Sequence, residues 1–128
     1  MIKPYEGLSH ILDEKRLVPI MNNTKWQELI SAMRSLPQIE PHVRIKYLHD
    51  DVAPKHYAPI WWEQLEQTGL ANIEWLEIKA MKESSTGLLA PTLQADYTDL
   101  FQEVLDKYGI PHEVEGEIFR IMGYQQLQ

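Results

Sequence analysis

The sequence predicts a small α/β (or α+β) domain in which a three-stranded sheet, parallel or mixed, packs against about four helices. Apolar residues recur at helical spacing in some segments and at every second position in others. The two kinds of segment follow one another in the order α-α-β-α-β-α-β. The 128 residues are the usual size of one domain, and 44% hydrophobic with 24% charged residues is an ordinary globular composition.

Two helices are expected at the N-terminal end. Residues 8–17 predict a short helix that Pro19 closes, and we interpret residues 1–20 as an N-terminal appendage to a single domain of residues 21–128. Residues 24–36 predict a longer helix. Its apolar face consists of Trp26, Leu29, Ile30, Met33 and Leu36.

Three strands and two more helices are expected after this point. Strands are predicted at residues 42–48, 72–79 and 117–122, with Gly116 at a bend or bulge before the last. Helices are predicted at residues 59–68, which begin with a proline, and 97–108, and a long loop at residues 84–91. Because helix-bearing segments separate the strands, we expect parallel pairing with right-handed connections.

The net charge of −7 is concentrated in two segments. Residues 95–117 contain seven acids and one base, and residues 63–77 contain four acids and no base. An acidic protein is repelled by phosphate backbones, so we expect no nucleic-acid binding, and the same field attracts a basic protein partner. The candidate contact residues are Asp99, Glu103, Asp106, Glu63 and Glu66, with Ile60 or Trp62 as apolar anchor. The alternative interpretation is a solvated face that keeps the protein soluble.

The composition excludes several classes of protein. The chain has no cysteine, so it forms no disulfide and uses no thiolate nucleophile or cysteine-based zinc site. The first seven residues have no apolar core of a signal peptide, and no apolar run approaches the roughly 20 residues of a membrane span. We therefore expect a cytoplasmic protein with no membrane contact.

One loop carries the residue types of a metal site. His49, Asp51 and His56 lie close together in sequence, and imidazole with carboxylate could hold a divalent ion for hydrolysis. Their spacing matches no ligand motif, and such residues are common in solvated loops. Nucleotide-binding glycine motifs and a nucleophile elbow are also missing from the sequence, so we expect no cofactor.

The pair Trp61-Trp62 suggests a binding platform, since tryptophan is enriched in interfaces. On a helical wheel, however, both tryptophans flank one apolar stripe with Leu65, which favours a place in the core with partial exposure of one ring. Ile60 lies outside the stripe and is the better candidate for an exposed apolar contact.

Four short segments resemble a family of small bacterial proteins catalogued only as a domain of unknown function. They are Asn23-Thr24-Lys25-Trp26, Val43-Arg44-Ile45-Lys46, the segment Asn72 to Ile78, and the ending Ile118 to Tyr124. The resemblance covers about residues 22–124 and implies no activity, cofactor or site residue.

Two classes of function follow from these observations. The first is a non-enzymatic interaction domain, immunity- or antitoxin-like, that presents its acidic faces to a basic partner. The second is an enzyme or small-ligand binder that uses the loop from His49 to His56. Self-association into a homodimer is compatible with either class.

Overall fold

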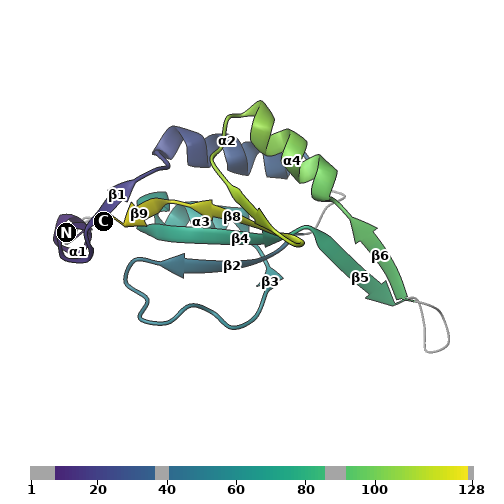
Figure 1. Ribbon diagram of the computed structural model, residues 1–128, viewed down its shortest axis with the longest axis horizontal. Coiled ribbons are helices and arrows are strands. Elements are labelled where there is room, and N and C mark those ends of the chain that lie inside the picture. Colours follow the sequence, from purple (N-terminus) through teal and green to yellow (C-terminus); the bar gives the residue numbers. More distant parts are fainter. Residues whose placement is uncertain (1–7, 37–40, 86–91, 127–128) are drawn as a thin grey trace.

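The structure is a computed structural model that describes residues 8–36, 41–85 and 92–126, with the backbone alone for 8–9, 81–85 and 92–95 (Figure 1). The helices are α1 (Leu8–Lys15), α2 (Asn23–Arg34), α3 (Trp62–Thr68) and α4 (Thr98–Lys107), with a 3-10 turn η1 (Leu70–Asn72). The strands are β1 (Leu17–Pro19), β2 (His42–Tyr47), β3 (Ala58–Pro59), β4 (Ile73–Lys79), β5 (Met81–Ser85), β6 (Thr92–Asp96), β7 (Glu113–Glu115), β8 (Ile118–Met122) and β9 (Tyr124–Gln126).

A five-stranded sheet of order β3-β2-β4-β8-β7 forms the centre, and every neighbouring pair in it is antiparallel. Two further antiparallel pairs, β1 with β9 and β5 with β6, extend from it. Mixed α and β structure with four helices among the described residues is therefore confirmed in its α+β form. The expected three-stranded sheet with parallel pairing is wrong.

The connection from β2 to β4 shows why pairing is antiparallel. After Tyr47 the chain returns along β2, because β3 pairs with His42 and Val43 at the beginning of that strand. Helix α3 then runs forward again, so β4 begins with Ile73 opposite Tyr47. A connection that runs along the sheet twice returns the chain to the end of the sheet where the previous strand finished, so the next strand is antiparallel to it. A parallel neighbour requires a connection that runs along the sheet once.

The connection from β4 to β8 repeats this path. Helix α4 begins beside the end of β4, where Tyr97 N donates to Ala80 O (2.8 Å), and runs towards the other end of the sheet. Strand β7 then returns, and the turn at Gly116, with φ of 61°, leads into β8 opposite Lys79. Gly116 is thus the turn of a hairpin, and β7 is an additional strand beyond the three that were expected.

Most predicted elements are confirmed, with shifts at their ends. The helices expected at 24–36 and 97–108 are α2 and α4, and the strands expected at 42–48 and 72–79 are β2 and β4. The expected helix start at Pro59 is wrong, because Pro59 pairs with His42 in β3 and α3 begins at Trp62.

The loop expected at residues 84–91 is partly replaced by the β5–β6 hairpin, which projects away from the sheet (Figure 1). Residues 86–91 lie outside the described residues. The strand β5, Met-Lys-Glu-Ser-Ser, has no apolar alternation, so periodicity gave no strand signal there.

Helices α2 and α4 cover one face of the sheet (Figure 1). The core lies between these two layers, and Phe101 of α4 meets Phe119 of β8 edge to face, with ring centroids 5.9 Å apart. Its other buried members include Trp26, Leu29, Ile30, Val43, Leu76, Ile78 and Ile121. Burial of this apolar surface supplies the main driving force for the two-layer arrangement.

The segment that begins α2 joins the two covering helices. Asn22 caps α2, its side chain accepting from Lys25 N at 2.8 Å. Lys25 Nζ donates to Tyr108 O at 2.6 Å, where a cation is favourable at the C-terminal end of α4. Trp26 is buried in the core. Capping, helix docking and core packing therefore follow one another within this segment.

Residues 8–20 form α1 and β1, and β1 pairs with β9 near the C-terminus, from Leu17 opposite Gln126 to Pro19 opposite Tyr124. The N- and C-terminal parts of the described chain therefore lie side by side (Figure 1). The division into residues 1–20 and 21–128 stays a prediction.

Gly123 lies at the tightest backbone contact in this part of the fold. Its N–H donates to Glu74 O at 2.8 Å, and its carbonyl accepts from Ile20 N at 2.9 Å. A Cβ atom here would lie 2.3 Å from Ile73 O and 3.3 Å from Trp26. Only glycine fits between these groups, so β8 can pass into β9 at this point.

We expect Gly123→Ala to lower the free energy of unfolding by about 2 kcal/mol, because the added methyl group meets backbone that cannot move freely. Gly116→Ala is the matched control, since nothing lies within 4 Å of its added Cβ and only its positive φ opposes the change. It should cost about 1 kcal/mol. Urea denaturation of both variants checks the order, and an equal or larger loss at Gly116 would contradict it.

Candidate functional site

A row of alternating charges crosses the face of the sheet opposite α2 and α4. The strand register places Arg44 of β2 opposite Glu77 of β4, and Glu77 opposite Arg120 of β8. Arg120 in turn lies opposite Glu113 of β7. Side chains directly opposite on one face are close enough to pair, so the row joins four strands.

Glu77 is the centre of this row, and its side chain is 1% exposed. Arg44 donates to its Oε1 through Nε at 2.8 Å and through a second guanidinium nitrogen. Arg120 donates to Oε2 through Nε at 2.8 Å, and its Nη2 lies 2.6 Å from the same oxygen. Tyr57 from the loop after β2 donates its hydroxyl to Oε1 at 2.9 Å.

These contacts fix the protonation of Glu77. Burial by itself would raise the pKa of this carboxyl group, but the hydrogen bonds from Arg44, Arg120 and Tyr57 outweigh it and hold the pKa below its ordinary value. Burial and its hydrogen bond to Glu77 raise the pKa of Tyr57. Glu77 therefore stays ionised and Tyr57 stays protonated at neutral pH, so neither has the pKa of a general acid or base near pH 7.

The cluster around Glu77 is thus a structural centre that also positions a loop. Arg44 lies over the rings of Tyr57 and Trp75, at 5.0 and 5.5 Å from their centroids. Its Nη1 donates to Pro54 O at 3.1 Å. These contacts draw residues 54–57, which precede β3, onto the charged face. This stretch therefore does not lie along the edge of β2, and β3 pairs only with the first two residues of β2.

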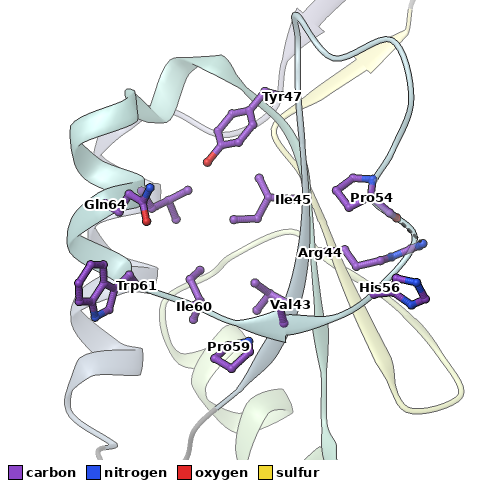
Figure 2. A pocket seen from close by; sticks show the side chains of 12 residues that line it. Val43, Arg44, Ile45, Tyr47, Pro54, His56, Pro59, Ile60, Trp61 and Gln64 are labelled. Atoms are coloured by element: carbon purple, nitrogen blue, oxygen red, sulfur yellow. Dashed lines mark hydrogen bonds between the residues drawn. The ribbon is translucent and has the colours of Figure 1, made fainter.

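The space beside the uncovered edge of β2 is a pocket of about 270 Å³ (Figure 2). Its walls are β2, residues 54–56, β3 and the beginning of α3. Figure 2 shows Ile45 and Tyr47 on one side, Gln64 and Trp61 on the other, and Ile60 between them. The lining is mainly apolar, and its one permanently charged side chain, Arg44, is neutralised by Glu77.

Trp61 is exposed by 78%, the largest value among the exposed large hydrophobic residues of the described chain. Its backbone is extended, with φ of −108° and ψ of 101°, because it precedes α3 as the N-cap. The helical-wheel placement of Trp61 in the core is therefore wrong, since a wheel applies only within a helix. Trp62 and Ile60 are half-buried and pack against the core, so Ile60 is not the exposed contact that we expected.

The loop proposed as a metal site does not bring its ligands together. Within the described residues, no group of three or more histidine, aspartate or glutamate side chains is placed to hold a metal ion. The ring of His49 stacks on Tyr47 at 5.7 Å, while Asp51 and His56 are exposed. Asp50 instead closes the turn after β2 by accepting from Tyr47 N at 3.0 Å.

The two acidic segments differ in their partners. In residues 63–77, Glu66 pairs with Arg34, Glu74 with Lys46 and Glu77 with its two arginines, while Glu63 is exposed. In residues 95–117, Glu117 pairs with Lys79. Among the described residues no ion pair within 4.0 Å reaches the other exposed acids of α4 and β7, which are Asp99, Glu103, Asp106, Glu113 and Glu115.

Fold and site together define a two-layer α+β domain with a carboxylate-centred charged sheet face and an open pocket at one sheet edge. The chain belongs to a family of unknown function, DUF6678, whose sequence model matches residues 8–128. This confirms the resemblance and extends it beyond the expected residues 22–124 in both directions. No curated protein and no solved structure matches the chain significantly. None of the described helices is long and apolar enough to cross a membrane.

We expect Glu77→Gln to lower the free energy of unfolding by about 3 kcal/mol, because the change leaves two arginines around a neutral, buried amide. Glu117→Gln is the matched control, since its ion pair with Lys79 joins β4 to the turn just before β8 but is 40% exposed on the glutamate side. It should cost less than about 1 kcal/mol. Equal losses in urea denaturation would show that burial of the Glu77 cluster adds nothing.

The stabilisation by Glu77 should also depend on pH. Its folded pKa lies below the unfolded value, so the contribution is complete above the unfolded pKa of about 4.3 and is lost as the pH falls through the folded pKa. The stability gap between the wild type and Glu77→Gln should therefore be widest near neutral pH and narrow below about pH 5. Urea titrations at a series of pH values measure this gap, and a gap that widens in acid would contradict the assignment.

Proposed function

We propose that this protein is a non-enzymatic interaction domain that binds a basic protein partner through the exposed acids of α4 and β7. We call this the α4–β7 surface; it consists of Asp99, Glu103, Asp106, Glu113 and Glu115. The observation that carries the proposal is that these five acids are exposed and make no ion pair within 4.0 Å among the described residues, although Glu113 and Glu115 lie near a cation, Arg120 of β8.

These acids flank one edge of the sheet. Strand β7 is the last strand of the sheet on this side and follows α4 in the chain. His112 links the two elements, since its Nε2 lies 2.9 Å from Gln102 Nε2 of α4 and its ring packs 6.0 Å from Phe119. The acids of α4 and those of β7, which lie on the other face of the sheet, together raise the negative potential around this edge, which attracts a basic partner and repels nucleic acid.

The other acidic segment contributes less to this proposal. Three of the four acids of residues 63–77 already neutralise cations of the same chain. A partner would have to break these pairs before it gained new ones, and for Glu77 that would leave two half-buried arginines without a counterion. An immunity- or antitoxin-like role in the cytoplasm is the biological setting we propose.

Reversing three charges of the α4–β7 surface tests this function. We expect Asp99→Lys, Glu103→Lys and Asp106→Lys together to abolish capture of basic proteins from a lysate of the source cells, because attraction becomes repulsion. Proteins captured by the wild-type chain and by the variant are identified and compared by mass spectrometry. The fold should persist, since all three side chains are exposed.

The control is an equal charge change elsewhere: Asp13→Lys and Glu14→Lys in α1 with Gln27→Lys and Ser31→Lys in α2, all at exposed residues outside both the α4–β7 surface and the pocket beside β2. Capture by this variant should match the wild type. If both variants lose the same partners, net charge and not the α4–β7 surface governs binding. If neither loses any, the proposal is wrong.

A further inference from the structure

We infer that the pocket beside β2 binds an extended, basic peptide segment of a partner protein, which adds a short strand to the edge of the sheet. The inference deepens and rests on the proposed interaction function. It assigns the partner segment to a site separate from the α4–β7 surface, at the opposite edge of the five-stranded sheet.

The main chain of Ile45 is the first element of this site. Leu48 N donates to Asn72 O, on the β4 side of β2, and Tyr47 N donates to Asp50 on the other side. Since N–H and C=O groups alternate sides along a strand, those of Ile45 point away from β4, as do those of Val43, which lies opposite Ala58 of β3. Strand β3 begins at Ala58 and so does not reach Ile45. Within the described residues, Ile45 has no main-chain partner on that side.

The Glu77 cluster keeps this edge open. If β3 continued along β2, His56 would lie opposite Ile45. The bonds of Tyr57 to Glu77 and of Arg44 to Pro54 instead draw this stretch to the charged face. An unpaired edge beside a pocket is the arrangement in which an extended peptide pairs through its main chain and places a side chain in the pocket.

The pocket selects an apolar side chain. Figure 2 shows Ile45, Tyr47, Ile60 and Trp61 around the space, with the amide of Gln64 at its side. No unneutralised permanent charge lines it, so a charged side chain would lose hydration there without gaining a partner. Trp61, which is exposed at the side of the pocket, gives further apolar contact.

Charge selects the residues on either side of that apolar side chain. The segment of residues 49–68, which frames the pocket, contains four acids and one base, Lys55. Asp51 precedes the pocket residue Pro54 by three positions and Glu63 follows the pocket residue Trp61 by two, and both acids are exposed. Lysine or arginine next to the inserted apolar residue complements these charges. A basic extended segment is also what the proposed partner would offer.

The probe is a phage-displayed library of random linear dodecapeptides, selected on the full chain. We expect the enriched peptides to have an apolar residue between basic ones. A synthetic peptide of an enriched sequence should bind Trp61→Ala and Ala58→Trp each with about tenfold lower affinity than the wild type. Trp61→Ala removes the exposed ring, and Ala58→Trp fills the pocket from an exposed position. Val114→Ala, at an exposed apolar residue of β7, is the control and should leave the affinity unchanged.

Amide hydrogen exchange measured by NMR adds a readout of strand addition. In the free protein the Ile45 amide should exchange faster than that of Arg44, which points towards β4, and the bound peptide should slow Ile45 selectively. Slow exchange at Ile45 in the free protein, or no slowing on binding, overturns the inference. So does a library without enriched peptides, or peptides that bind both pocket variants as well as the wild type.

Two further outcomes separate this inference from its alternatives. Concentration-dependent dimerisation in sedimentation that Ala58→Trp abolishes would show that a second copy occupies the edge, which overturns the peptide assignment. The Asp99, Glu103 and Asp106 reversal should leave the affinity for the dodecapeptide unchanged, which supports a separate site. Loss of partner capture in that variant with no peptide binding to the wild type would retain the proposed function and reject this inference.

Discussion

The buried carboxylate of Glu77 is the interaction on which much of the molecule depends. Two arginines from neighbouring strands and one tyrosine from a loop converge on it, so that one ionised group satisfies several donors on the sheet face opposite α2 and α4. A buried charge is costly unless its partners are complete, and here they come from β2, β8 and the loop before β3. The register of the central strands and the path of the loop are therefore coupled to a single side chain.

This coupling connects stability to the features on which recognition is proposed. By holding residues 54–57 on the charged face, the cluster leaves part of the β2 edge without a strand and shapes the pocket beside it. At the far edge of the sheet, β7 is short and flanked by glutamates, which discourages uncontrolled strand pairing while it adds to the negative surface. The two edges thus differ in chemistry. The edge at β2 borders a mainly apolar pocket, whereas the edge at β7 carries exposed acidic side chains.

Local sequence patterns predicted the elements that have a regular periodicity. Helix α2 and helix α4 followed from their apolar stripes, and β2 and β4 from alternation. The short strand β3 gave no such signal, because two residues are too few for a period to show. The direction of strand pairing was predicted wrongly. It depends on how many times the connecting segment runs along the sheet, and the short strands β3 and β7 each add one such run. For the site, alternation placed Arg44 and Lys46 on the outer face, but no spacing in the sequence links Arg44 to Glu77 or Glu77 to Arg120.

The sequence by itself determined the class of domain, its main helices and strands, its family and the location of its negative charge along the chain. These depend on residue type and on contacts within a few positions. The tertiary structure alone decided which acids are neutralised, that Trp61 lies outside the core, and that Glu77 is buried between residues 33 and 43 positions away. Such outcomes depend on strand register and loop path, which arise from the packing of the whole chain and leave no local pattern in the sequence.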